Sequence, residues 1–150
     1  FETGGDILTP ENREKYKQLK IMDITQWLKE VVLPRIKVIR PKNRILLHPT
    51  CSCQIMGLTP VLLDIARKCA REVILPDNWG CCGASGDRGF IFPELSDSAT
   101  RDERDEIGHE SFDGCYSLAR TCEIAMQDHI EQRYESIVYL VDETIQDQGT

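Results

Sequence analysis

The sequence predicts an α/β fold: a small parallel sheet of about four strands with helices on both faces, preceded by a helical segment. From residue 44 onward, short apolar runs alternate with segments of helical periodicity. Such alternation is typical of parallel strands joined by crossover helices. The chain has 150 residues, of which 41% are hydrophobic, so it is long enough for about one domain with a sizeable core.

The amino-terminal part, residues 1–43, is expected to be a linker and a helical segment. A short exposed helix is predicted within residues 11–20, because that stretch is mostly charged. A second helix is expected after Asp23, since Asp23 and Gln26 have the spacing of a capping box. Its apolar positions, Ile24, Trp27, Leu28, Val31 and Val32, are expected to share one buried face, and Pro34 marks its approximate end.

Residues 44–150 are expected to form the sheet domain. Strands are predicted at residues 44–48, 72–75, 115–118 and 136–138, and helices at residues 55–70, 97–111, from Cys122 onward, and 139–146. The strand at residues 72–75 is expected to be buried on both faces. In the helix at residues 97–111, the acidic residues Asp102, Glu103, Asp105 and Glu106 are interpreted as a solvated face.

The charge balance disfavours some classes of partner. A net charge of -7 and an isoelectric point near 5.0 argue against a nucleic-acid partner, because such partners reward clusters of Lys and Arg. No apolar run approaches the roughly 20 residues needed to cross a bilayer. The first residues also lack the basic region and apolar stretch of a signal peptide. We therefore expect a cytoplasmic protein.

Seven cysteines are the main chemical signal of the chain, and an odd number argues against a complete set of internal disulfides. The predicted strand ends lead into Cys51, into Cys81 and Cys82, and into Cys122. Since parallel strands place ligands beyond their carboxyl ends, these thiols are expected to meet at one edge of the sheet. Four thiolates are the usual ligand set of a 4Fe-4S cluster and also of tetrahedral zinc, and these four are the candidate metal ligands.

Four further residues are candidates for secondary roles at such a centre. Gly80 and Gly83 are expected to expose backbone amides to cluster sulfides as cofactor-binding residues. His48 is interpreted as a hydrogen-bond donor to a sulfur or as a ligand, with a buried structural histidine as the alternative. Cys53 is an additional candidate ligand if the loop after Cys51 is extended, and otherwise a small buried residue.

Cys122, Cys69 and Cys115 differ in their expected surroundings. Cys122 is predicted in the first turn of a helix, where free backbone N-H groups lower a thiol pKa. Cys69 lies on the apolar face of its predicted helix, and Cys115 lies in a predicted strand, so both are interpreted as core residues.

Three segments resemble a known family when they are taken together: residues 48–53 (HPTCSC), residues 79–83 (WGCCG) with 86–89 (GDRG), and residues 120–123 (RTCE). They resemble the cysteine-rich CCG domain of heterodisulfide reductase, of the iron-sulfur protein of glycolate oxidase, and of the carboxy-terminal part of FAD-linked D-lactate dehydrogenases. The resemblance covers about residues 20–146 and is closest to the last group.

The resemblance implies an electron-transfer domain that holds an iron-sulfur cluster and serves an FAD-linked dehydrogenase of 2-hydroxy acids. It implies an FAD domain and a ferredoxin-like domain elsewhere in the same protein, and a downstream acceptor such as a quinone or a cytochrome. The resemblance also implies that the linker and helical segment, from about residue 10 to residue 43, is the tail of a preceding module. This chain would then be cytoplasmic or peripheral to the membrane as part of the full enzyme, and not catalytic alone.

One departure from the family pattern concerns the cluster type. Heterodisulfide reductase modules end in C-x-x-C, whereas Cys122 here is followed by Glu123, Ile124 and Ala125. A conventional 4Fe-4S cluster with four thiolates is therefore favoured over a five-cysteine noncubane cluster. Two alternatives stay open: a structural zinc module, and a thiol-disulfide module that uses Cys81 with Cys82 or Cys51 with Cys53.

Overall fold

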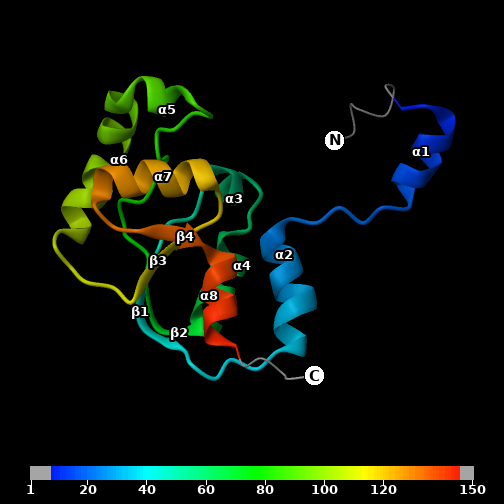
Figure 1. The fold of residues 1–150 in the computed structure, drawn as a ribbon, viewed down its shortest axis with the longest axis horizontal. Helices are drawn as coiled ribbons and strands as arrows, with labels where there is room; N and C mark the ends of the chain where they lie inside the picture. The colour runs from blue at the N-terminus through cyan, green and yellow to red at the C-terminus, as the bar shows by residue number, and fades with distance from the viewer. Residues whose placement is uncertain (1–7, 146–150) are drawn as a thin grey trace.

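The computed structural model describes residues 8–145 and contains a four-stranded sheet in which every pairing is parallel (Figure 1). The strands, in the spatial order β2-β1-β3-β4, are β1 (Lys42–Leu47), β2 (Ala70–Ile74), β3 (Gly114–Ser117) and β4 (Tyr134–Ser136). The α-helices are α1 (Pro10–Lys17), α2 (Ile24–Trp27), α3 (Cys51–Ile55), α4 (Thr59–Cys69), α5 (Arg88–Ile91), α6 (Pro93–Ile107), α7 (Arg120–Ile130) and α8 (Ile137–Thr144). This architecture confirms the predicted α/β fold.

The sheet carries a separate hydrophobic cluster on each face. Ile45 and Leu47 of β1 belong to a cluster with α4 and α8, whereas Leu46 belongs to a cluster with α7 and the end of α6. All three side chains are buried, which is expected of a central strand covered by helices on both sides. The alternation of neighbouring residues between the two clusters places α4 and α8 on one face and α6 and α7 on the other.

The strand order creates a reversal point at the centre of the sheet. Ile45 of β1 pairs with Val73 of β2 on one side and with Gly114 of β3 on the other. The chain therefore leaves β1 toward one edge and leaves β3 toward the opposite edge. In open parallel sheets, ligands bind beyond the carboxyl ends of the strands at such a reversal point.

The amino-terminal elements differ in how they meet the sheet domain. Helix α1 buries none of its residues, and Figure 1 shows it standing away from the sheet. Helix α2 begins with the predicted capping box at Asp23, and it continues as a π-helix, η2 (Leu28–Val32), and a 3-10 turn, η3 (Leu33–Arg35). Leu28 and Leu33 enter the core cluster of α4 and α8.

The prediction that one helical face buries all five apolar residues of this segment was wrong, because Ile24 and Trp27 are exposed. The buried positions of this turn are Thr25 and, three residues later, Leu28, so the face that meets the core is displaced by one residue from Ile24 and Trp27.

Two strands also differ from the predictions. Strand β2 lies at the edge of the sheet, and because it has a single neighbouring strand, Val73 and Ile74 are only half-buried rather than buried on both faces. Strand β4 ends at Ser136, and α8 begins at Ile137, because the Ser136 side chain accepts the Val138 N-H (3.4 Å) and caps the helix.

Part of the predictions falls on residues 1–7 and 146–150, which lie outside the described residues. Across the part of the chain that is described, we find no helix with both the length and the apolar character to cross a membrane.

Candidate functional site

A pocket of about 350 Å³ lies beyond the carboxyl ends of β1 and β3, at the reversal point of the sheet. Four cysteines line it: Cys51, Cys81, Cys82 and Cys122. The other lining residues are Thr50, Ser52, Ala84, Ser85, Gly86, Ala119 and Thr121. The structure thus brings the four predicted thiols together from three separate segments of the chain.

Cys51 and Cys122 both lie in the first turn of a helix. Cys51 is the first residue of α3, whose start is capped by Thr50, because the Thr50 side chain accepts the Cys53 N-H (3.3 Å). Cys122 is the third residue of α7, which follows β3 after Ala119. Both helices therefore begin at the pocket, and the positive ends of their dipoles favour negative charge there.

The loop that carries Cys81 and Cys82 is held in place by close backbone contacts. Gly83 has a φ angle of +74°, and a Cβ atom at this position would lie 2.6 Å from the Leu95 carbonyl oxygen, so no larger residue fits. The Gly83 N-H donates to the Cys81 sulfur over 3.4 Å. Gly80 has open space where its Cβ would lie, and it does not line the pocket.

A carboxylate of α6 anchors the beginning of the same loop. The two carboxylate oxygens of Glu106 accept the N-H groups of Asp77 (2.7 Å) and Asn78 (2.8 Å). These bonds hold the pKa of Glu106 below its usual range, with the bond from Asn78 as the larger cause. The loop is thus fixed to α6 shortly before the two cysteines.

The sulfur atoms of Cys82 and Cys122 lie 3.0 Å apart, within hydrogen-bonding distance, and both residues are buried. The hydrogen bond with Cys122 lowers the pKa of the Cys82 thiol to about 6, against the effect of burial, and the Ala84 backbone and the His48 charge act in the same direction. The same hydrogen bond, together with burial, raises the pKa of Cys122. Cys122 lies in the first turn of its helix, as predicted, but the contact with Cys82 and burial outweigh the effect of the helix terminus, so its pKa is raised.

His48 lies at the end of β1 and pairs with a carboxylate of α6. Its Nδ1 atom is 2.9 Å and 3.1 Å from the two carboxylate oxygens of Glu103, and the side chains of His48 and Glu103 are only 1% and 2% exposed. The His48 carbonyl accepts the Ser117 hydroxyl (2.9 Å), which fixes the residue between β1 and β3. Within residues 8–145, the Nε2 atom of His48 has no hydrogen-bond partner, so the imidazole donates to no sulfur there.

The interpretation of Glu103 as part of a solvated face was wrong, because its side chain is buried against His48. The buried residues of α6 are Ser96, Thr100, Glu103 and Ile107. They recur at spacings of three and four, which is the periodicity of a helix face that contacts the core. This spacing is the signal that could have identified Glu103, although three of the four side chains are polar.

The other three cysteines do not line the pocket. Cys53 is buried in the cluster of α4 and α8, where its sulfur lies 4.0 Å from the Thr59 hydroxyl and burial raises its pKa. Cys69 lies in the same cluster, and Cys115 lies in the opposite one, where burial raises its pKa to about 12. Cys69 and Cys115 are core residues, as predicted.

The donor set of the pocket fits a metal centre, because four thiols are the ligand number of a 4Fe-4S cluster and of structural zinc. Among the described residues, however, no group of three or more His, Cys, Asp or Glu side chains is already arranged to hold a metal ion. The four cysteines share a pocket without forming a coordination shell. Coordination would require the sulfur atoms to move closer together.

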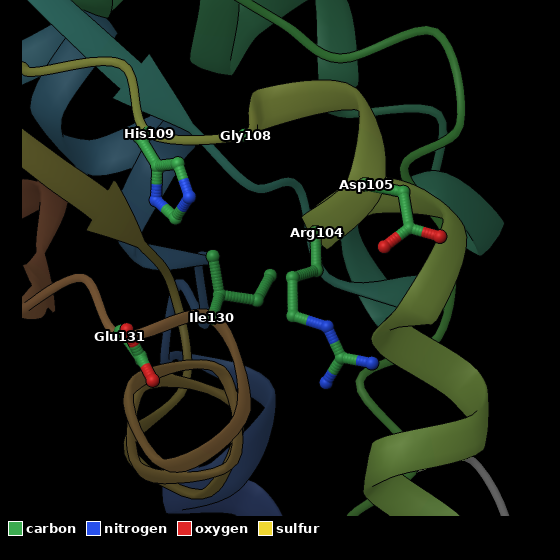
Figure 2. Close-up of a pocket in the computed structure, with 6 residues that line it drawn as sticks. All are labelled: Arg104, Asp105, Gly108, His109, Ile130 and Glu131. Carbon is green, nitrogen blue, oxygen red and sulfur yellow. The ribbon is translucent and has the colours of Figure 1, made fainter.

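A larger hollow of about 480 Å³ lies at the carboxyl ends of α6 and α7 (Figure 2). Figure 2 shows its lining residues on the end of α6, on the loop that follows and at the end of α7. Its Arg104 guanidinium already binds the Asp97 carboxylate (2.8 Å) and the His129 carbonyl (3.2 Å). These segments lead into the amino ends of β3 and β4, so the hollow lies at the edge where parallel sheets do not usually bind ligands.

Comparisons with known proteins give no match: no family model matches the chain, and no curated protein or solved structure is significantly similar to it. A function is therefore inferred from the cysteine pocket and from the sequence motifs that form it.

Proposed function

We propose that this chain is an iron-sulfur electron-transfer domain in which Cys51, Cys81, Cys82 and Cys122 hold a 4Fe-4S cluster. The observation that supports this most strongly is the meeting of four cysteines, from three segments, in one pocket at the reversal point of the sheet. Cys53 is not among the proposed ligands, because it lies in a separate core cluster.

The residues of the chain have distinct roles in this proposal. When bound, a 4Fe-4S cluster supplies one-electron transfer. Cys82 and Cys122 are buried and would hold its inner side, whereas Cys51 and Cys81 are exposed and would leave its outer side near the surface, where an electron partner can approach. The Gly83 amide, which already donates to the Cys81 sulfur, would stabilise negative charge on that ligand.

The wider context of the proposal comes from the family resemblance. We propose that the domain serves an FAD-linked dehydrogenase of the D-lactate type, with the flavin and ferredoxin-like domains of the same protein as donors. A quinone or a cytochrome would be the downstream acceptor. The enzyme would be cytoplasmic or peripheral to the membrane.

The test is anaerobic reconstitution of the reduced chain with ferrous iron and sulfide. We expect about four iron atoms per chain and broad visible absorption from sulfur-to-iron charge transfer. Cys82→Ser should abolish both signals. Cys115→Ala is the matched control, because Cys115 is an equally buried thiol outside the pocket, and it should load iron as the wild type does.

Two results would contradict the proposal. Stoichiometric zinc with no iron uptake would indicate a structural zinc module instead, since zinc has no redox chemistry. Equal iron uptake by the wild type and by Cys82→Ser would show that the iron is not held in this pocket.

A further inference from the structure

We propose that Cys82 and Cys122 form a peroxide-sensitive dithiol in the metal-free protein and close into a disulfide between the loop after β2 and helix α7. This inference concerns the protein's own thiols. Only its last consequence, the effect on metal loading, rests on the function proposed above.

The geometry singles out this pair among the cysteines of the pocket. The sulfur atoms of Cys82 and Cys122 are 3.0 Å apart, and a disulfide bond measures about 2.0 Å, so the two sulfurs have to approach each other by about 1 Å. Among the described residues, no other pair of cysteine sulfurs is in hydrogen-bond contact. The Cys81 sulfur instead accepts the Gly83 N-H.

The pocket gives a small oxidant access to these sulfurs. Cys82 and Cys122 are only 4% and 7% exposed, yet both line the pocket of about 350 Å³. A water molecule takes up about 30 Å³ of liquid, so the pocket can admit a molecule as small as hydrogen peroxide. Larger disulfide oxidants would reach the exposed Cys51 and Cys81 more easily.

The chemistry balances with a hydroperoxide as the oxidant. One thiolate attacks the peroxide oxygen, the oxygen-oxygen bond breaks, and a sulfenic acid and an alcohol form, or water in the case of hydrogen peroxide. The second thiol then attacks the sulfenic sulfur, the sulfur-sulfur bond forms, and water leaves. The two thiols lose two electrons and two protons in total, and the hydroperoxide is reduced.

The disulfide would occupy two of the four proposed metal ligands. If the pocket binds a cluster, the oxidised protein cannot be loaded until a thiol reductant opens the bond. Oxidation would thus control whether the site can take up metal.

The experiment treats reduced, metal-free protein with stoichiometric hydrogen peroxide and counts thiols after unfolding. We expect the count to fall from seven to five per chain, with a peptide map that links Cys82 to Cys122. In Cys122→Ser the link cannot form, and dimedone should label a sulfenic acid on Cys82; in Cys82→Ser it should label Cys122. The control Cys115→Ala should form the same link as the wild type, because Cys115 lies outside the pocket.

Retention of all seven thiols, or a link that involves Cys51 or Cys81 in place of this pair, would overturn the inference. Iron uptake is then measured before oxidation, after it, and after reduction. If the disulfide forms but no iron binds even to the reduced protein, the proposed function fails and the dithiol stands. If iron binds but no Cys82-Cys122 link forms, the proposed function stands and the dithiol inference fails.

Discussion

Replacing Glu103 by alanine tests how much the buried pair of His48 and Glu103 contributes to stability. Glu103→Ala leaves the His48 Nδ1 atom without its acceptor inside a core where Nε2 already has none among the described residues. The imidazole cannot recover water, because the side chain of His48 is 1% exposed. In this variant the two ring nitrogens of His48 would lack hydrogen-bond partners in the folded protein, whereas in the unfolded chain they bind water.

The expected loss follows from this burial. Removing one partner of a buried charged pair costs about 3–5 kcal/mol, and leaving a neutral buried donor unpaired costs about 1–3 kcal/mol. Truncation of the side chain adds a small cavity, at about 0.8 kcal/mol per buried methylene. We therefore expect Glu103→Ala to lower the free energy of unfolding by about 3 kcal/mol or more. Glu103→Gln keeps an oxygen that can accept from Nδ1 and should lose less.

The assay is urea unfolding of reduced, metal-free protein, with the midpoint and the m-value fitted for each variant. Asp102→Ala is the matched control, since this neighbouring carboxylate of α6 is exposed, and it should change stability by less than about 0.5 kcal/mol. If Glu103→Ala is as stable as Asp102→Ala, the pair of His48 and Glu103 does not stabilise the fold.

Two further predictions concern the loop that carries Cys81 and Cys82. Gly83→Ala should cost about 2 kcal/mol or more in urea unfolding, because its φ angle is +74° and the new Cβ would lie 2.6 Å from the Leu95 carbonyl oxygen. Glu106→Gln should cost about 1 kcal/mol at pH 7, since it weakens charge-assisted bonds from two backbone N-H groups at a solvent-exposed position. The folded-state pKa of Glu106 is lowered, so this stabilisation is complete when the pH is above the ordinary glutamate pKa of 4.5. It is lost as the pH falls through the folded-state pKa. The stability difference between wild type and Glu106→Gln should therefore shrink in acid.

The predictions for Gly83→Ala and Glu106→Gln each have a control. Gly80→Ala should leave the unfolding midpoint nearly unchanged, because nothing lies within 4 Å of the added Cβ; equal losses for Gly80→Ala and Gly83→Ala would contradict the close approach at Gly83. For Glu106, a difference from wild type that stays constant between pH 7 and pH 3 would show that the carboxylate charge has no part in anchoring the loop.

The sequence was sufficient to predict the sheet and the meeting of the thiols because both depend on local patterns. The apolar run at residues 45–47 indicates a strand, and the cysteines follow strand ends, so the topology of a parallel sheet places them at one edge. Neither prediction needs knowledge of distant contacts.

Cys53 and Glu103 depend on contacts that the local sequence does not reveal. Cys53 would lie beside Cys51 in an extended loop, but Thr50 caps a helix there. On a helix, residues two apart point in different directions, so Cys53 faces the core instead of the pocket. Glu103 has the spacing of a buried helix face, but its partner His48 lies 55 residues away in the chain, and no local pattern predicts that pairing.

The pairing of β1 with β3 at the reversal point also determines which insertions are compatible with the cysteine pocket. The pairing of Leu47 with Tyr116 sets the positions of Cys51 and Cys122 relative to each other, and the number of residues between the two strands does not. Residues added to the turn after Gly108 would lengthen a connection far from the pocket and leave this pairing intact. A slip of one residue between β1 and β3 would instead move Cys51 by about 3.3 Å relative to Cys122 and turn buried side chains to the opposite face. Insertions in this turn are therefore compatible with the pocket, whereas register slips are not.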